Sequence, residues 1–124
     1  MTTAALVLIA IQLESLRRSL LALLAISPLF SAVHSVEDAR SAAAAAAQLQ
    51  PVLVVLDADL LRGEAVKTIE QIKAAAPHTR CIVLVDTIQE QRAMESTRAD
   101  RVLFKGYPAA ELLTVVKHLL TAVS

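Results

Sequence analysis

The chain has 124 residues, of which 56% are hydrophobic, so it is long and apolar enough to fold as one domain with a sizeable core. Its 12 Lys and Arg residues balance 12 Asp and Glu residues, which excludes a strong net attraction for nucleic acid, an anionic membrane or an acidic substrate. Aromatic residues are scarce, with two Phe, one Tyr and no Trp, and this argues against a surface that stacks single-stranded bases.

The single cysteine, Cys81, cannot form an internal disulfide and lies in an apolar run. We therefore expect a buried thiol in a reducing compartment, and a cytoplasmic protein. The most apolar stretch, residues 19–33, is interrupted by Pro28 and is shorter than the roughly 20 residues that a membrane-spanning helix needs. Residues 1–10 lack the basic leader of a secretory signal, so we expect no interaction with a membrane.

Short apolar runs alternate with longer segments of helical periodicity. The first run, residues 5–11, predicts a strand. Leucines at helical spacing in residues 13–24 predict a helix that must stop before Pro28. Residues 29–34 then predict a second strand.

The middle of the chain repeats this alternation. Ser35, followed three residues later by Asp38, is a typical signal for a helix N-terminus, and the alanine tract at 42–47 predicts the body of that helix. Residues 52–56 form a continuous run of Val and Leu, which is typical of a strand that is covered on both faces. Asp57 ends this run.

Four further segments and a final helix complete the pattern. Residues 64–76 predict a helix, 81–85 a strand, 88–97 a more polar helix, 102–104 a strand, and 108–122 the last helix. Because strands separated by helices pair in parallel through right-handed crossovers, we expect a doubly wound α/β domain with helices on both faces of a five-stranded sheet. We expect a single domain over residues 1–124.

Functional sites in such sheets lie beyond the carboxyl ends of the strands. The positions to test are therefore Ile11, Gln12, Asp57, Asp59, Asp86 and Lys105.

Four segments carry a resemblance to a known family. They are residues 52–57 (VLVVLD), 99–105 (ADRVLFK), 16–20 (LRRSL) and 36–39 (VEDA). In their order and spacing the whole chain resembles the receiver domain of bacterial two-component response regulators. This resemblance implies a flavodoxin-like (βα)5 three-layer sandwich whose parallel strands have the order 2-1-3-4-5.

The family transfers a phosphoryl group from a kinase phosphohistidine to an aspartate, with a divalent cation and a lysine neutralising the phosphoryl oxygens. By resemblance, Asp57 is the candidate phospho-acceptor and Lys105 the candidate phosphate-stabilising residue. The family's two magnesium-binding acids match Ile11 and Gln12, and neither is an acid. We therefore expect no metal cofactor of ordinary affinity. Weak magnesium binding would use Asp57 and the backbone carbonyl of Asp59, with Glu14 or Asp86 leaning in.

Three further positions depart from the family. The hydroxyl residue at the end of the fourth strand falls on Val85, or on Thr87 if the loop shifts by two residues. The aromatic switch residue falls on Val102. The loop at residues 60–63 lacks the family's proline and is about two residues shorter. The switch positions are therefore degenerate.

Other polar residues have simpler interpretations. We expect Gln12 and Glu14 to cap the first helix, and Asp59 and Asp86 to be ordinary loop acids. The three histidines show no metal-ligand spacing. They are His34, His78 and His118. No phosphate-binding glycine loop or nucleophile elbow is present in the sequence, so hydrolase and nucleotide-binding functions are disfavoured.

Three functional hypotheses remain. The preferred one is an atypical receiver, not an enzyme, that signals through protein–protein contacts with weak or no phosphorylation of Asp57. The alternative is a fully competent receiver that accepts phosphate from a sensor histidine kinase. A third class is a flavodoxin-like domain that binds a small ligand. We expect the partner to be a kinase or another signalling protein, with no direct contact to nucleic acid, and a homodimer is possible through the face formed by residues 88–97, 102–104 and 108–122.

Overall fold

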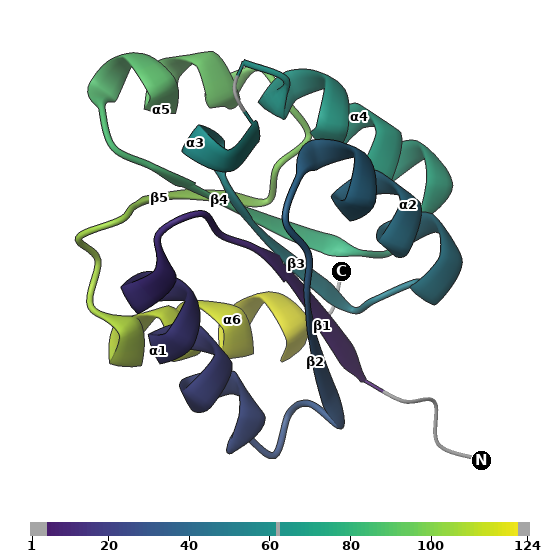
Figure 1. The fold of residues 1–124 in the computed structure, drawn as a ribbon, viewed down its shortest axis with the longest axis vertical. Helices are drawn as coiled ribbons and strands as arrows, with labels where there is room; N and C mark the ends of the chain where they lie inside the picture. Colours follow the sequence, from purple (N-terminus) through teal and green to yellow (C-terminus); the bar gives the residue numbers. More distant parts are fainter. Residues whose placement is uncertain (1–4, 62, 122–124) are drawn as a thin grey trace.

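The computed structural model describes residues 5–61 and 63–121 and contains a five-stranded parallel sheet with the order β2-β1-β3-β4-β5 (Figure 1). The strands are β1 (Leu6–Ala10), β2 (Ala32–Ser35), β3 (Leu53–Asp57), β4 (Arg80–Val85) and β5 (Arg101–Phe104). Helices lie on both sides of this sheet. The predicted doubly wound fold and its strand order are therefore confirmed.

The helices form two layers. Helices α1 (Glu14–Ala25) and α6 (Ala109–Thr121) cover one face of the sheet, and α2 (Ala39–Leu49), α4 (Ala65–Ala75) and α5 (Ile88–Glu95) cover the other (Figure 1). A short helix, α3 (Ala58–Leu61), follows β3 directly. None of the helices in the described part of the chain combines the length and apolar character needed to span a bilayer.

Strand β3 positions the site because it lies at the centre of the sheet and is buried along its whole length. Its side chains alternate between the two layers. Leu53 and Val55 pack on the α1 and α6 side, and Val54 and Leu56 pack on the α2, α4 and α5 side. This double burial is the reason for the continuous apolar run in the sequence. The strand ends at Asp57, at the end of the sheet that carries the carboxyl ends of all five strands.

The second strand differs from the prediction. It begins at Ala32, because the preceding residues form a turn in which the Ser27 hydroxyl oxygen accepts a hydrogen bond from the Leu29 N–H at 3.2 Å. Phe30 anchors this turn by packing into the α1 and α6 layer with 8% exposure. One apolar run in the sequence thus covers both a turn and a strand. Hydrophobic periodicity alone does not show where the turn ends and the strand begins.

The start of α2 also differs. Asp38 is the N-cap, and its carboxylate accepts a hydrogen bond from the Ser41 N–H at 2.7 Å, whereas Ser35 is the last residue of β2. The predicted Ser35 cap is therefore wrong. The hydrogen bond to Ser41 also holds the pKa of Asp38 below its usual value.

A buried polar cluster ties α4 to the last two strands. The Lys73 ammonium, 8% exposed, contacts Asp100 at 2.8 Å and donates to the Thr79 carbonyl at 2.7 Å. Asp100 also accepts from the Cys81 N–H at 2.7 Å. Burial raises the pKa of Asp100, but the hydrogen bonds from Lys73 and Cys81 outweigh burial and leave that pKa below its usual value. This cluster lies at the opposite end of β4 from Asp57 and serves the fold.

Candidate functional site

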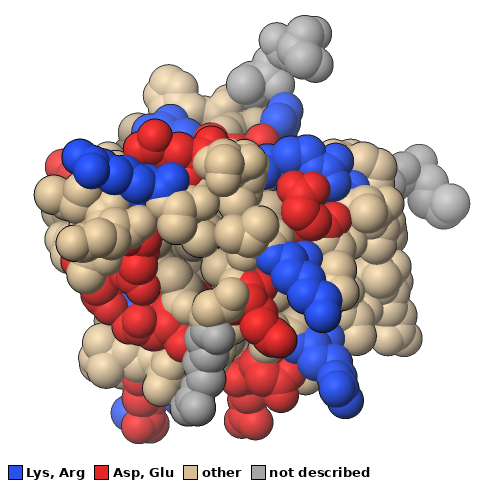
Figure 2. Space-filling model, turned by 90° about the horizontal axis from the view of Figure 1, so that it is seen from above, with Lys and Arg blue, Asp and Glu red and all other residues tan. Residues whose placement is uncertain are grey.

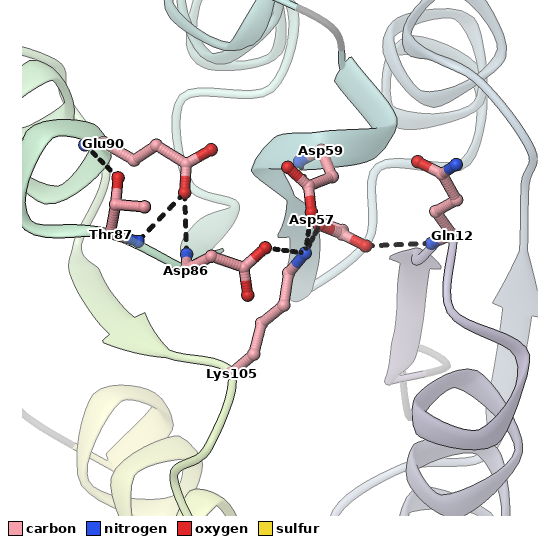
Figure 3. Close-up of polar contacts among 7 residues, drawn as sticks. All are labelled: Gln12, Asp57, Asp59, Asp86, Thr87, Glu90 and Lys105. Carbon is pink, nitrogen blue, oxygen red and sulfur yellow. Dashed lines mark hydrogen bonds and ion pairs between the residues drawn. The ribbon is translucent and has the colours of Figure 1, made fainter.

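Asp57 is held by contacts to both of its carboxylate oxygens. The side chain is completely buried. Oδ2 accepts a hydrogen bond from the Gln12 N–H at 3.0 Å, and Oδ1 accepts one from the Asp59 N–H at 3.0 Å. Lys105 Nζ lies 2.7 Å from the same Oδ1 atom (Figure 3). The carboxylate is thus fixed by two backbone donors and one ammonium group.

Lys105 is the residue that follows β5, and its side chain reaches the site from there. Its own N–H donates to the Val85 carbonyl at 2.9 Å, which continues the ladder between β4 and β5 and fixes the start of the side chain. The side chain is 13% exposed, and its Nζ atom also contacts Asp59 Oδ2 at 2.6 Å and Asp86 Oδ2 at 3.0 Å. Three carboxylates therefore surround one ammonium group, which has three N–H donors (Figure 3).

The cluster has three carboxyl groups and only one ammonium group, so its charges do not balance. Burial by itself lowers the pKa of Lys105, but its hydrogen bonds to the three aspartates outweigh burial and hold that pKa above the usual lysine value. The hydrogen bond from Lys105 lowers the pKa of Asp59. The hydrogen bond to Asp59 raises the pKa of Asp86, because the two carboxyl groups lie against each other. Asp86 is therefore the acid of this pair that takes up a proton first as the pH falls.

The structure places the side chain of Asp86, and not that of Val85, against the Lys105 ammonium group. Val85 pairs with Phe104 across the sheet. The residues that follow them, Asp86 and Lys105, therefore lie side by side. The Val85 side chain is fully buried in the layer below α2, α4 and α5. The register between β4 and β5 shows that Asp86 is the neighbour of Lys105. The apolar run that ends at Val85 does not show this in the sequence.

Thr87 is committed to a structural role. It is the N-cap of α5, where its hydroxyl oxygen accepts a hydrogen bond from the Glu90 N–H at 3.1 Å. The Glu90 carboxylate returns the interaction by accepting from the N–H groups of Asp86 at 2.7 Å and Thr87 at 3.2 Å. This capping box fixes the loop that carries Asp86 (Figure 3). The Thr87 hydroxyl is thus used to begin a helix.

The two positions that match the family's acidic pair lie beside Asp57, but neither places a carboxylate there. Ile11 is 1% exposed and packs in the α1 and α6 layer. Gln12 contributes its backbone N–H to Asp57. The prediction that Gln12 or Glu14 caps the first helix is wrong, because the N-cap of α1 is Leu13, which makes no side-chain cap hydrogen bond.

A magnesium ion at the family's usual position does not fit these residues. Ile11 has no donor atom, and Gln12 would be a neutral ligand in place of an acid. Asp59, Asp86 and Glu90 each place one oxygen within 4.8 Å of the others. However, Lys105 binds Asp59 and Asp86, and the capping box uses Glu90. A cation there would compete with the protein's own ammonium group.

The last predicted switch position, Val102, lies on β5 and is partly buried against the α2, α4 and α5 layer. The aromatic side chains near Lys105 are instead Phe104 and Tyr107, which are 38% and 39% exposed. They flank Lys105 in the sequence and line a small depression beside it. An aromatic group is thus available on the surface next to the site, at positions other than the family's switch.

The site opens into a groove of about 670 Å³ at the carboxyl ends of the strands. Its lining residues are Gln12, Leu13, Glu14, Asp57, Asp59, Asp86 and Lys105. Four of these side chains are acidic and one is basic, so the groove disfavours anionic ligands. Over the side of the molecule that carries α2, α4 and α5, acidic and basic side chains are interspersed (Figure 2).

Comparison with known proteins gives a match in structure alone. No protein-family model matches the chain, and no curated protein matches it in sequence. The CheY-like receiver domain of a response regulator from Methanospirillum hungatei JF-1 is 18% identical with a TM-score of 0.83, and the alignment covers 95% of this chain and 94% of that one. The signal receiver domain of an HD domain-containing protein from Pseudomonas fluorescens Pf-5 is 24% identical with a TM-score of 0.80, covering 97% and 89%.

A third similar structure is the phosphorylated cyanobacterial phytochrome response regulator RcpA, which is 19% identical with a TM-score of 0.75 and is matched over 98% of both chains. The chain therefore has the CheY-like flavodoxin fold of response-regulator receiver domains, as the resemblance in its sequence predicts.

Proposed function

We propose that this protein is a receiver-like signalling domain that acts through protein–protein contacts and does not depend on phosphorylation of Asp57. The observation that carries the proposal is the saturation of Lys105 by three carboxylates, in a site where Ile11 and Gln12 replace the magnesium-binding acids. In a competent receiver, the lysine and the metal are needed for the incoming phosphoryl oxygens.

Charge repulsion opposes a phosphoryl group on Asp57. A phosphoryl group on Asp57 would bring its oxygens against the carboxylates of Asp59 and Asp86, which already surround Lys105. Like charges at such distances repel unless a cation lies between them. Asp57 itself is buried, and both of its oxygens accept hydrogen bonds within the protein. Attack on phosphorus would therefore have to break existing contacts without a metal to compensate.

The same cluster supports a fixed conformation. Lys105 ties together the ends of β3, β4 and β5, because it bonds to Asp57, Asp59 and Asp86 at the same time. These bonds need no ligand. We propose that they hold the surface formed by α5, β5 and α6 in one arrangement.

That surface is the proposed contact site for a partner protein. It exposes three large apolar side chains, with Ile88 57%, Phe104 38% and Tyr107 39% exposed, and the charged side chain of Arg101. Apolar and aromatic groups beside an arginine are the side chains that protein interfaces favour. The partner would be a sensor histidine kinase or another signalling protein.

The proposal is tested by incubating the protein with acetyl phosphate and magnesium, followed by intact mass spectrometry. Asp57→Asn is the matched control, because it keeps the shape of the side chain and removes the nucleophile. We expect no phosphate adduct on either protein. An adduct on the unchanged protein that is absent in Asp57→Asn would contradict the proposal.

A second candidate function is a phosphorylation-competent receiver. It is favoured by the 2.7 Å contact between Lys105 and Asp57, which places the two groups that phosphoryl transfer would need together. The same experiment decides between the two, because only a competent receiver forms the Asp57-dependent adduct.

A further inference from the structure

Strand β2 forms one edge of the sheet and is hydrogen-bonded to β1 alone. The Val36 N–H, just after β2, donates to the Ile9 carbonyl at 2.9 Å. Because the peptide groups of successive residues in a strand point to opposite sides, the N–H and C=O groups of Val33 and Ser35 point away from β1. In the described residues no strand pairs with that side. These groups are therefore available to another strand.

The two edges of the sheet carry different side chains. Strand β5, at the opposite edge, begins with the exposed Arg101 and is followed by Lys105. Around β2, the whole segment 26–36 contains no Lys, Arg, Asp or Glu. Charged residues and prolines within edge strands are common protections against unwanted pairing, and β2 itself has neither.

An apolar groove lies beside this edge. It has a volume of about 280 Å³ and is lined by Leu21, Ala25, Phe30, Ser31, Ala32 and Val33. Ile26, at the end of α1, is 81% exposed. The edge thus combines unpaired backbone groups with uncharged, mostly apolar side chains, which suits the addition of a strand rather than the binding of an ion.

We infer that β2 is a self-association edge, at which a second copy of this chain adds its own β2 in antiparallel orientation. A two-fold contact uses the same surface on both copies, so that surface must be complementary to itself. A charge-free strand meets this condition, since it brings no like charges together. A strongly charged partner segment would find no opposite charge in segment 26–36.

The antiparallel orientation follows from the charges at the strand ends. Glu37 and Asp38 come directly after this segment, and both are exposed. In a parallel arrangement the two Glu37 side chains would lie together. In an antiparallel pair centred on His34, Val33 of one copy exchanges hydrogen bonds with Ser35 of the other. Glu37 of one copy then lies across from Ser31 of the other, so the acids are at opposite ends. The two exposed His34 residues then face each other as the non-hydrogen-bonded pair at the two-fold axis.

The first test is sedimentation velocity over a range of protein concentrations. We expect a concentration-dependent dimer. His34→Lys places a charge near the axis, and Ser35→Pro removes an outward N–H; each should weaken dimerisation at least about tenfold. Gln71→Lys, on the exposed side of α4, and Tyr107→Asp, on the α5, β5 and α6 surface, should dimerise as the unchanged protein does. Circular dichroism melting would show that each variant is folded.

The second test is cross-linking through His34→Cys. Two cysteines that face each other on the axis as a non-hydrogen-bonded pair have a Cα separation of about 4.5 Å, which lies within the range of about 4.4–6.8 Å that a disulfide allows. The natural Cys81 is buried and does not compete. We expect a rapid intermolecular disulfide from His34→Cys and a slow one from Gln71→Cys.

Three results would overturn the inference. They are a monomer at millimolar concentration, a dimer that His34→Lys leaves intact while Tyr107→Asp abolishes it, and equal cross-linking rates for the two cysteine variants. The inference does not rest on the proposed function, because β2 lies at the opposite edge of the sheet from β5.

Discussion

Lys105 Nζ lies 2.7 Å from Asp57 Oδ1, and the Asp57 side chain has no exposure to solvent. The two groups therefore form a buried ion pair at the point where β3 and β5 end. Since a buried charge is costly without its partner, the pair is expected to dominate the stability of this end of the sheet.

Replacement of Lys105 by Met should destabilise the protein by about 3 kcal/mol, because Asp57 would remain buried without its ammonium partner. Urea denaturation followed by circular dichroism measures this loss. The double variant Lys105→Met with Asp57→Asn should recover part of it. Lys117→Met, on an exposed position of α6, is the control and should change stability by less than about 0.5 kcal/mol. Equal losses in the two Met variants would argue against a buried pair.

Replacement of Asp86 by Asn should stabilise the protein at pH 7 by less than about 1 kcal/mol, because the pKa of Asp86 is raised by the neighbouring Asp59. A carboxyl group with a raised pKa favours the folded state most when it is protonated, so its contribution is lost as the pH rises through the folded-state pKa. The gain from Asp86→Asn should therefore disappear below the ordinary value of 3.8. Urea midpoints at pH 7 and pH 3 give this comparison, and a gain that grows in acid would contradict the charge arrangement.

Asp100 should carry much of the acid sensitivity of the fold. Its pKa is lowered by Lys73 and Cys81, so its contribution is present above the ordinary carboxyl value and is lost as the pH falls through the lower folded-state value. Asp100→Asn should cost about 3 kcal/mol at pH 7, since Lys73 stays buried, and the difference from the unchanged protein should shrink in acid. Glu70→Gln, which breaks an exposed contact with Arg98, is the control and should cost less than about 1 kcal/mol.

Cys81 should be unreactive in the folded protein. Burial raises the pKa of this thiol to about 12, and the thiolate is the reactive form. A chromogenic disulfide reagent at pH 8 should label the thiol only after denaturant is added. Rapid stoichiometric labelling of the native protein would show that β4 is open to solvent.

Much of the fold was predictable because the central strands are buried on both faces. Residues 52–57 therefore appear as an uninterrupted apolar run that ends at Asp57. The second strand was misplaced because Phe30 is as apolar as a strand residue but packs in a turn. The four-residue helix α3 is too short to show a period.

The candidate site was predictable only in part. Asp57 and Lys105 each follow a recognisable strand, so their meeting at one edge of the sheet follows from parallel topology. The contact between Asp86 and Lys105 depends on the register of β4 against β5, and register is a property of the folded sheet. The commitment of Thr87 to the cap of α5 likewise depends on where that helix begins.

The central claim is that the site is complete without a phosphoryl group. Amide NMR spectra of the protein with magnesium, recorded before and after addition of beryllofluoride, test it most directly, because this anion imitates an aspartyl phosphate. We predict unchanged resonances for Asp57, Asp86 and Lys105 and for the α5, β5 and α6 surface. Chemical-shift changes that spread from Asp57 to Tyr107 and are absent in Asp57→Asn would contradict the account.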